Sequence, residues 1–233
     1  MNIPGNVRGV GGIILAGGHS RRFGDRDKLL IDLGYGRTMI EEVAGELSFL
    51  EDCVISTGEA GRARRYRELT GIRTALDRGR GILAGILAGC LDLSTELVFV
   101  VGADMPFIRR EVIEFQIGSA TDFDAVVPRY PNGYLEPIHS VLRRTPAIGK
   151  LEGLCGSGQR RVGLLFECLN TRYLPVELMA GKDPDLGCFT NINDRSALES
   201  ARRKSRSILH QAQNSRSSSS KSARALTSSL ERD

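Results

Sequence analysis

The chain has 233 residues, of which 41% are hydrophobic and 26% are charged; this length and composition suit one α/β domain. Residues 201–233 carry eight Lys or Arg against two Asp or Glu, so the net charge of +4 leaves −2 for residues 1–200. Because the basic charge belongs to the end of the chain, it gives no reason to expect a nucleic-acid partner.

The cysteines and the apolar runs indicate the cellular compartment of the protein. Five cysteines are widely spaced and form no C-x-x-C pair, which favours reduced thiols over a zinc site or a disulfide framework. No apolar run approaches the ~20 residues of a membrane span. Glycines interrupt the apolar residues 10–16, and no small-residue cleavage site follows them, so we expect no secretory signal. We therefore predict a cytoplasmic protein without a membrane partner.

Short apolar runs alternate with stretches of helical spacing along the first half of the chain. The apolar runs predict strands at residues 10–16, 53–57, 72–76, 97–101 and 125–127, and a short extended piece at 29–33. The helical spacing predicts helices at residues 38–50, 62–70, 82–93 and 109–117. This alternation predicts βαβ crossovers and a mostly parallel sheet.

The pattern changes after Pro128. Asn132-Gly133 is a turn signal between residues 129–131 and 134–142 and predicts a hairpin. Helices are expected at 146–153 and 161–169, a strand at 173–176, and a last helix from Arg195 with Asp194 as its cap. We predict an α/β fold: a single Rossmann-like domain over residues 1–204, with a mostly parallel central sheet, helices on both faces and a β-hairpin excursion. Residues 205–233 form a Ser/Arg-rich tail whose composition predicts disorder.

The first strand runs directly into a glycine-rich, basic loop. Gly17-Gly18 would let backbone N–H groups approach phosphate oxygens, and Arg21, Arg22 and Lys28 would supply cations. Lys28 stands too far from Gly24 for a Walker A loop, and the dinucleotide-binding glycine pattern is absent. The alternative is an ordinary strand-to-helix turn with solvated arginines.

Two carboxylates follow predicted strands. Asp104 comes at the end of the apolar run 97–101, where it could hold Mg²⁺ against phosphates. Asp77 follows the run 72–76 in the same way. For Asp104 the alternative is a turn residue whose carboxylate only accepts hydrogen bonds from nearby amides.

Two further segments carry weaker signals. Residues 79–85, Gly-Arg-Gly-Ile-Leu-Ala-Gly, place glycines before a helix, which suits either a flat base and ribose or close helix–sheet packing. Asn191 and Asn193 alternate on an extended segment and would present both amides on one face, to a polar ligand or a metal-bound water. A turn followed by a helix cap is the alternative there.

Together these residues resemble the molybdenum cofactor guanylyltransferase (MobA-like) family of nucleotidyltransferases. The likeness covers roughly residues 10–200 in the right order. The matching motifs are Leu15-Ala16-Gly17-Gly18, Arg22-Phe23-Gly24, Asp27-Lys28, Leu83-Ala84-Gly85, Asp104-Met105-Pro106-Phe107, Leu135-Glu136-Pro137 and Asn191-Ile192-Asn193. Ile82 stands where the family usually has Pro, and Thr57-Gly58 where it usually offers an Asn to the base.

The resemblance implies an enzyme that transfers GMP from GTP to the molybdopterin cofactor and releases pyrophosphate. It implies catalytic roles for Arg22, Lys28 and Asp104, with Mg²⁺ held by Asp104. It implies phosphate binding by the amides of residues 16–18, and ribose and base binding by Asp77 and residues 81–85. The complete implied nucleotide- and acceptor-binding set is Leu15, Ala16, Gly17, Gly18, Lys28, Thr57, Asp77, Leu83, Ala84, Gly85, Asn191 and Asn193.

Other functions and partners remain open at this point. The first alternative is another nucleotidyltransferase, such as a molybdopterin cytidylyltransferase or a sugar-phosphate nucleotidyltransferase; the second is a non-catalytic nucleotide-binding regulator. GTP and the molybdopterin cofactor are the expected substrates, and molybdoenzymes or cofactor-biosynthesis proteins are candidate partners. We expect a monomer or a weak homo-oligomer, and a packed His139 with no role as a base.

Overall fold

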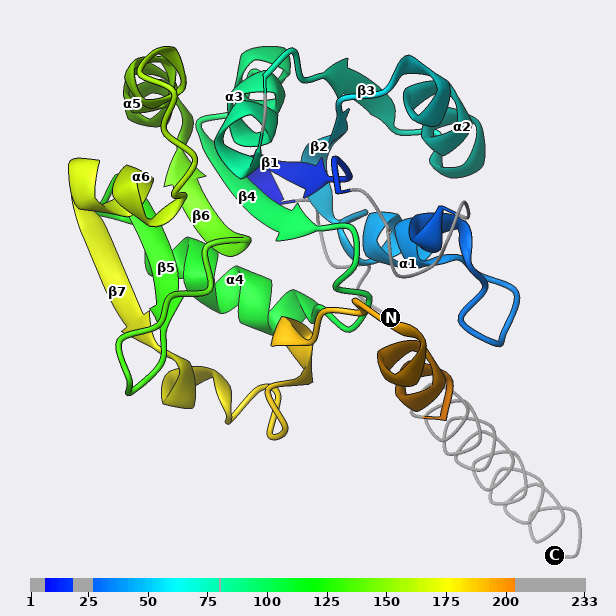
Figure 1. Ribbon diagram of the computed structural model, residues 1–233. Helices are drawn as coiled ribbons and strands as arrows, with labels where there is room; N and C mark the ends of the chain where they lie inside the picture. Colours follow the sequence, from blue (N-terminus) through cyan, green and yellow to red (C-terminus); the bar gives the residue numbers. More distant parts are fainter. Residues whose placement is uncertain (1–6, 19–26, 80, 204–233) are drawn as a thin grey trace, which may run out of the picture.

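The structure is a computed structural model that describes residues 7–18, 27–79 and 81–203. Arg21, Arg22 and the tail of residues 205–233, for which expectations were stated, lie outside the described residues. The described chain folds around a seven-stranded sheet with the strand order β3-β2-β1-β4-β6-β5-β7 (Figure 1). The strands are β1 (Val7–Leu15), β2 (Leu50–Thr57), β3 (Arg73–Leu76), β4 (Leu97–Gly102), β5 (Ala125–Arg129), β6 (His139–Arg143) and β7 (Thr171–Pro175).

The sheet is mostly parallel, as predicted. β1 pairs in parallel with β2 and β4, β2 pairs in parallel with β3, and β5 pairs in parallel with β7. Among the described strands only β6 runs the other way, between β4 and β5. The turn at Asn132-Gly133 therefore lies in the connection between the antiparallel strands β5 and β6. Residues 134–138 of this connection form no strand and make one isolated bridge, between Leu135 and Arg129.

Helices cover both faces of the sheet, which confirms the predicted architecture. Residues of α1 (Met39–Glu46), α2 (Ala60–Thr70) and α4 (Arg110–Gly118) share one apolar core with the sheet. Residues of α3 (Ile82–Asp92), α5 (Arg144–Gly156) and α6 (Gly163–Cys168) share a second core on the opposite face (Figure 1). Ile13 and Ile14 of β1 are both fully buried, one in each core, because neighbouring strand residues point to opposite faces. Burial on both faces explains why the central strands are continuous apolar runs.

One element differs from its prediction. Residues 29–33 were expected to be extended, but Lys28–Leu30 form a 3-10 turn, η2. The Asp27 carboxylate accepts a hydrogen bond from the Leu29 N–H at 3.1 Å and so caps this turn. Three residues are too few for an apolar pattern to reveal such a turn, and the local side-chain cap decides it.

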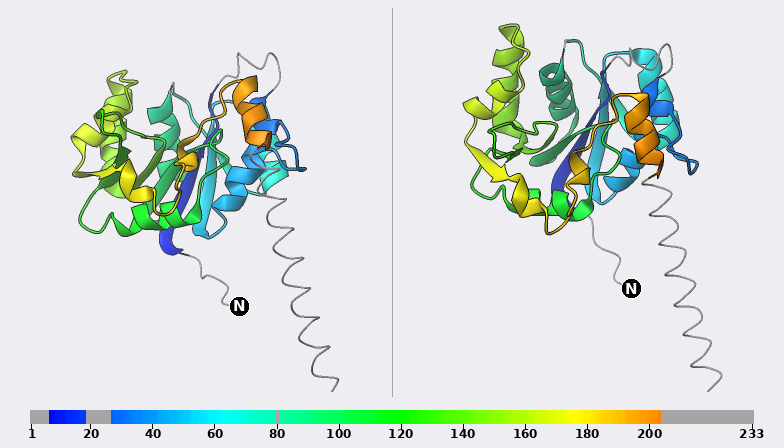
Figure 2. Two further views of the ribbon diagram at one scale, coloured as in Figure 1. Left: turned by 90° about the horizontal axis from the view of Figure 1, so that it is seen from below. Right: turned by 60° about the horizontal axis from the view of Figure 1, so that its bottom comes forward.

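The last described helix covers residues 195–203 and packs beside α1 (Figure 2). Asp194 accepts a hydrogen bond from the Ala197 N–H at 2.9 Å, which confirms the predicted cap. Leu198 and Ala201 pack with Leu33 and Met39 in a third, smaller core. Ile192 belongs to the same core, so this helix anchors the segment that carries Asn191 and Asn193.

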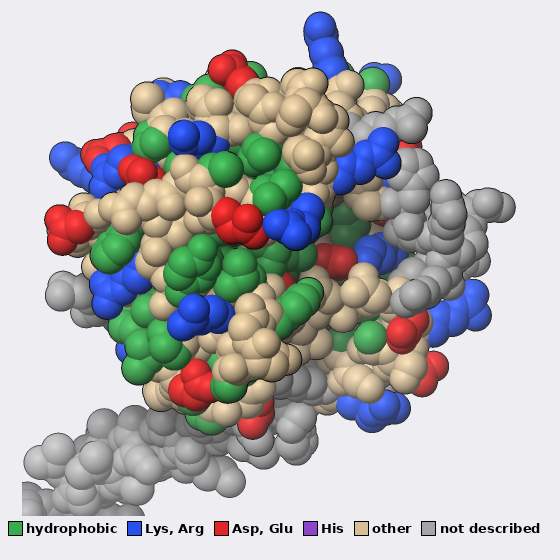
Figure 3. All heavy atoms as spheres, turned by 60° about the vertical axis from the view of Figure 1, so that its left-hand side comes forward, with side chains coloured by type: hydrophobic (Ala, Val, Ile, Leu, Met, Phe, Trp, Pro, Cys, Tyr) green, Lys and Arg blue, Asp and Glu red, His purple; other side chains and the backbone are tan. Residues whose placement is uncertain are grey.

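The surface carries both signs of charge. On the face shown in Figure 3, Lys and Arg side chains stand singly among Asp, Glu and hydrophobic side chains. Within residues 7–18, 27–79 and 81–203, no helix is both long and apolar enough to cross a membrane.

Candidate functional site

The parallel strands β1, β2, β3 and β4 end at one edge of the sheet. In the sheet register, Leu15 lies opposite both Ser56 and Gly102, and Thr57 lies opposite Leu76. The loops that follow these strands therefore start side by side, where open α/β sheets bind ligands. This edge brings together the residues that the sequence singled out from four separate segments.

A charged cluster forms where three of these segments meet. The Lys28 ammonium donates to Asp104 Oδ2 at 2.7 Å, to Asn193 Oδ1 at 3.0 Å and to the Ile192 carbonyl at 3.1 Å. Lys28 is 9% exposed, and its ammonium lies against a carboxylate and two neutral oxygens. The Ile192 N–H donates to the Asp104 carbonyl at 2.8 Å, which fixes the late segment onto the β4 loop. We call Lys28, Asp104 and Asn193 the ammonium cluster.

Asp27, next to Lys28, is held from the side of α2. Both Asp27 oxygens lie 3.0 Å from the Arg62 guanidinium, through Arg62 Nε and Nη2. The Tyr66 hydroxyl donates to Asp27 Oδ2 at 2.6 Å. Neither Arg62 nor Tyr66 was predicted from the sequence as a site residue. Their spacing of four residues, on either side of the buried Ala63, puts them on the packed face of α2, and that is the signal that could have found them.

The Asp77 carboxylate lies on the other side of the edge, among glycines. A Cβ atom built on Gly58 would lie 3.2 Å from its Oδ1, closer than ordinary contact, and one built on Gly17 would lie at an ordinary contact distance of 3.5 Å from its Oδ2. Burial raises the pKa of Asp77 above its ordinary value. Among the described residues, none donates a hydrogen bond to this carboxylate, whereas the Asp77 N–H donates to the Thr57 carbonyl at 3.1 Å. We call Asp77 with Gly17, Gly58 and Gly85 the glycine-lined side.

The backbone of the first loop agrees only in part with the expected phosphate site. The Ala16 N–H donates to the Ser56 carbonyl at 2.8 Å, so this amide is already hydrogen-bonded within the sheet. Gly17 and Gly18 are exposed, and within the described chain their N–H groups donate to no residue. Leu15 ends β1 and is half-buried; its carbonyl accepts from the Ala103 N–H at 3.0 Å.

Several other expected site residues are buried rather than presented at the edge. Thr57 is fully buried, and its hydroxyl, like that of Ser56, has no partner among the described residues. Leu83, Ala84 and Gly85 form the buried start of α3, so this segment supports the edge by packing. Asn191 is half-buried and its amide donates back to the Phe189 carbonyl at 3.4 Å. Of the two late asparagines, only Asn193 joins the ammonium cluster.

Glu136 adds a second acid near Asp104. It is 7% exposed, and burial, followed by the charge on Asp104, raises its pKa to about 7. Glu136 belongs to the Leu135-Glu136-Pro137 motif, for which no role was predicted from the sequence.

His139 is a core residue, as expected. It is fully buried, and its ring lies edge-on to Phe99 and Phe189 at centroid distances of 5.0 and 4.9 Å. Burial lowers its pKa to about 3, so it is neutral near pH 7 and makes no general base at the edge. The described parts of the chain offer no group of three or more His, Cys, Asp or Glu side chains placed to hold a metal ion.

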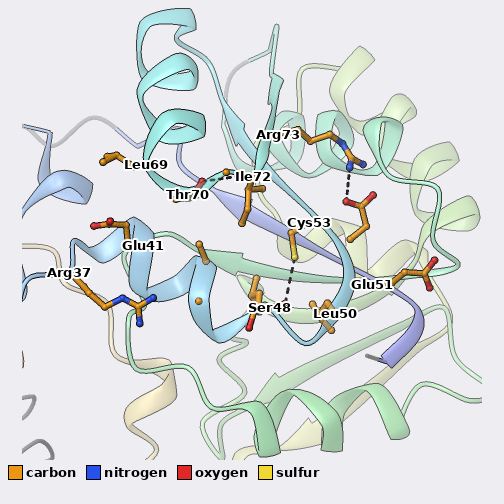
Figure 4. Close-up of a pocket in the computed structure, with 15 residues that line it drawn as sticks. Arg37, Glu41, Ser48, Leu50, Glu51, Cys53, Leu69, Thr70, Ile72 and Arg73 are labelled. Carbon is orange, nitrogen blue, oxygen red and sulfur yellow. Dashed lines mark hydrogen bonds and ion pairs between the residues drawn. The ribbon is translucent and has the colours of Figure 1, made fainter. Parts of the chain in front are cut away.

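A separate cavity of about 590 Å³ lies at the beginning of β2 and β3, the opposite edge of the sheet (Figure 4). Leu50, Cys53 and Ile72 form part of its wall, and Arg37, Glu41 and Arg73 stand around it. β2 advances about 20 Å between Leu50 and Thr57 at the usual rise per strand residue, so this cavity lies well away from the ammonium cluster.

Known proteins share this fold and much of this sequence. The profile of the MobA-like NTP transferase domain matches residues 12–167. The molybdenum cofactor guanylyltransferase of Desulfosudis oleivorans is 35% identical over 194 residues, which are 82% of this chain and 94% of that protein. The probable molybdenum cofactor guanylyltransferase of Pyrococcus furiosus is 36% identical over 193 residues, which are 80% of this chain and 93% of that protein.

A solved structure is similar over the same range. The molybdopterin-guanine dinucleotide biosynthesis protein A of Archaeoglobus fulgidus superposes with a TM-score of 0.75 at 28% identity, covering 84% of this chain and 99% of that one. A 4-diphosphocytidyl-2C-methyl-D-erythritol synthase from Anaerococcus prevotii superposes with a TM-score of 0.63 at 14% identity, covering 85% of this chain and 99% of that one, a likeness of fold alone.

Proposed function

Because this chain belongs to the family of MobA-like NTP transferase domains, we propose that it transfers GMP from GTP to the molybdopterin cofactor, with release of pyrophosphate. It is a nucleotidyltransferase. The observation that carries the proposal is the ammonium cluster, in which Lys28 and Asp104 meet at 2.7 Å where β1 and β4 end. The names of the relatives supply the nucleotide and the acceptor, and the cluster supplies the chemistry.

The proposed reaction needs little from the protein beyond position and charge. A terminal phosphate oxygen of the acceptor attacks the α-phosphorus of GTP in line. A bond forms between that oxygen and the α-phosphorus, and the bond to the β-phosphate oxygen breaks, so that pyrophosphate leaves with the electron pair. The attacking phosphate monoester is already ionised near neutral pH, so it requires no base. Held geometry and charge neutralisation therefore account for the catalysis.

The residues of the edge divide this work. Lys28 neutralises the negative charge that develops on the leaving pyrophosphate, and Arg22, which lies outside the described residues, is proposed to assist it. The N–H groups of Gly17 and Gly18, which donate to no residue in the described part of the chain, hold phosphate oxygens. Asp77 binds the ribose and base side of the nucleotide, and Gly85 at the buried start of α3 borders this site. Asn193, which accepts from the Lys28 ammonium at 3.0 Å, is proposed to face the reacting phosphates, and Asn191 the acceptor.

The donor set at the edge fits one divalent cation. Asp104 contributes a carboxylate whose side chain is 21% exposed. Asn193 contributes an amide oxygen, and this oxygen and the carboxylate both accept hydrogen bonds from the Lys28 ammonium. Mg²⁺ characteristically takes one or two carboxylates and completes its shell with water and substrate phosphates. Mg²⁺ held by Asp104 would neutralise charge on the phosphates.

Location and partners complete the proposal. All five cysteines lie in the described part of the chain and are free thiols, which supports a reducing compartment such as the cytoplasm. The chain covers more than nine-tenths of the length of each of the two relatives named above. The proposed activity therefore does not depend on a domain that is present in those two proteins and missing from the matched part of this chain.

The test is a comparison of nucleotides with the full chain. The protein is incubated with Mg²⁺, the molybdopterin cofactor and GTP, CTP, ATP or UTP in turn, pyrophosphate release is measured, and the product mass is determined. We expect turnover with GTP and a product that has gained one GMP. Asp104→Ala should abolish turnover, whereas Asp185→Ala, which removes an exposed carboxylate elsewhere, should not. CTP turnover above that of GTP would reject the guanylyl assignment, and tight GTP binding without turnover would favour a nucleotide-binding regulator.

A further inference from the structure

We propose that Arg62 of α2 is a positioning residue that fixes both ends of the glycine-rich loop and thereby sets the position of the Lys28 ammonium. This inference rests on the proposed function, because it assigns Arg62 a part in turnover at the same site. Among the described residues Arg62 pairs with Asp27, Gly18 and, at 3.8 Å, Glu59, and with none of the residues of the ammonium cluster, so we expect its effect on the reaction to pass through Asp27 and Gly18.

The first contact lies at the end of the loop. Arg62 Nε donates to Asp27 Oδ2 and Arg62 Nη2 lies on Asp27 Oδ1, each at 3.0 Å. Two parallel contacts from a planar guanidinium fix the plane of the carboxylate as well as its distance. The same carboxylate caps η2 through the Leu29 N–H, and η2 begins at Lys28. The orientation of Asp27 is therefore passed on to the residue that follows it.

The second contact lies at the start of the loop. Arg62 Nη1 donates to the Gly18 carbonyl at 3.1 Å, so one guanidinium holds Gly18 and Asp27 together. The two residues are nine positions apart in the sequence. Gly18 has no side chain that could restrain its backbone. The hydrogen bond from Arg62 therefore fixes the direction in which the Gly18 carbonyl points, toward α2.

The surroundings of this contact make it strong and selective for a guanidinium. The side chains of Arg62 and Asp27 are 16% and 14% exposed, so losing one charge would leave the other largely buried and unpaired. Tyr66 is fully buried and donates to Asp27 at 2.6 Å. Burial and this hydrogen bond raise the pKa of the Tyr66 phenol, so it stays a donor at every pH at which the protein is assayed. A lysine at position 62 would keep the charge but could not span both loop ends.

The consequence for the reaction follows from the position of Lys28. Its ammonium reaches Asp104, Asn193 and the Ile192 carbonyl within 3.1 Å, and a shift of η2 would break this set. A misplacement of about 1 Å in a group that acts on the transition state can reduce turnover about 10²-fold. Arg62 therefore acts at a distance on kcat, through the placement of Lys28.

The same helix offers a matched control. Arg64 lies two positions further on, its side chain is 80% exposed, and it pairs with Glu68 one turn away. Arg62→Met and Arg64→Met remove the same charge from the same helix. A change in helix propensity or in net charge would affect both variants alike, whereas a positioning role belongs to Arg62 alone.

The experiment measures kcat, the KM for GTP and the melting temperature of the full-length variants. We expect Arg62→Met and Arg62→Lys each to lower kcat about 10²-fold at a temperature where the protein remains folded, with Arg64→Met unchanged. Tyr66→Phe, which leaves the Arg62 contact intact, should lower kcat only about threefold. A wild-type kcat in folded Arg62→Met, or in Arg62→Lys if Arg62→Met does not fold, would overturn the inference.

A double variant separates positioning from a direct role. If Arg62 acts through Lys28, adding Arg62→Met to Lys28→Met should cost less than about twofold more, because the two losses are not additive. Independent, multiplicative losses would overturn the inference. Failure of the proposed function would look different: the wild-type chain itself would then show no turnover with GTP, and the series would be repeated with whichever nucleotide it accepts.

Discussion

The ammonium cluster and the glycine-lined side occupy the same edge of the sheet but differ in how complete they are. The Lys28 ammonium already has three protein acceptors, contributed by segments 76 to 165 residues away in the sequence. The Asp77 carboxylate, by contrast, receives no hydrogen bond from the described residues, and its neighbours at Gly17, Gly58 and Gly85 leave space around it. One region is assembled before any substrate arrives, and the other leaves its half-buried carboxylate open to a ligand.

This difference suggests a division of labour. Groups that stabilise a transition state work best when they are fixed in advance, since no reorganisation is then needed during the reaction. Groups that choose a ligand work best when the correct ligand alone satisfies them, since a wrong one leaves a polar group unpaired. We therefore assign turnover to the ammonium cluster and nucleotide choice to the glycine-lined side.

The largest expected effect comes from the ammonium cluster itself. Lys28→Met removes the cation while keeping most of the buried stem, and it should lower kcat about 10²–10³-fold, the cost of losing one preorganised donor. Steady-state pyrophosphate release measures it. Lys150→Met, which removes an exposed lysine on α5, serves as the control. A loss in Lys28→Met confined to KM would instead assign this residue to ground-state binding.

The acidic surroundings of the cluster should affect stability in a pH-dependent way. Burial and the charge on Asp104 raise the pKa of Glu136 to about 7, above its value of 4.5 in an unfolded chain. Stability from such a group is fully present below pH 4.5 and is lost as the pH rises through 7. Compared with Glu136→Gln, the wild type should therefore lose about 2–3 kcal/mol of unfolding free energy between pH 5 and pH 8. Denaturant titrations at the two pH values measure this, and an equal difference at both would contradict the assignment.

The glycine-lined side should respond to the smallest change, one added methyl group. A Cβ on Gly85 would lie 3.1 Å from Leu15 Cδ2 and 3.3 Å from Ser56 Oγ, at the border of the Asp77 site. Gly85→Ala should raise the KM for GTP about threefold, with stability changed by less than about 1 kcal/mol because the helix gains propensity.

Gly89→Ala is the matched variant on the same helix. Its Cβ would lie within 2.9 Å of three atoms of the fully buried Ile13, away from Asp77. It should destabilise the fold by about 1–3 kcal/mol and leave the KM for GTP unchanged. The same pattern of effects in both variants would remove the distinction between a ligand border and ordinary packing.

The sequence predicted those parts of the molecule that depend on local pattern. Apolar runs such as residues 97–101 read as buried strands because the sheet is covered on both faces, and Lys28 and Asp104 were found because each follows a recognisable strand or loop. The alternation of Asn191 and Asn193 on an extended segment put both on the same list, although it could not show that Asn191 turns back to the Phe189 carbonyl.

The remaining parts depend on contacts that no local pattern encodes. Arg62 lies 35 residues from Asp27 in a charged helix, and only the packing of α2 brings the two together. The 3-10 turn at Lys28–Leu30 follows from the same contact, since the orientation of Asp27 decides which amide it caps. Burial of Thr57 was equally invisible, because a hydroxyl at a strand end can face either the core or the edge.

The division of labour between the two regions can be tested by one ratio measured in three proteins. The measurement is kcat/KM for GTP divided by kcat/KM for CTP, in the wild type, in Lys28→Met and in Asp77→Asn. Lys28→Met should lower both values and keep the wild-type ratio, because phosphates are common to all nucleotides. Asp77→Asn should reduce the ratio about tenfold, the effect of one lost hydrogen bond to a charged group. A ratio that changes in Lys28→Met but not in Asp77→Asn would contradict the account.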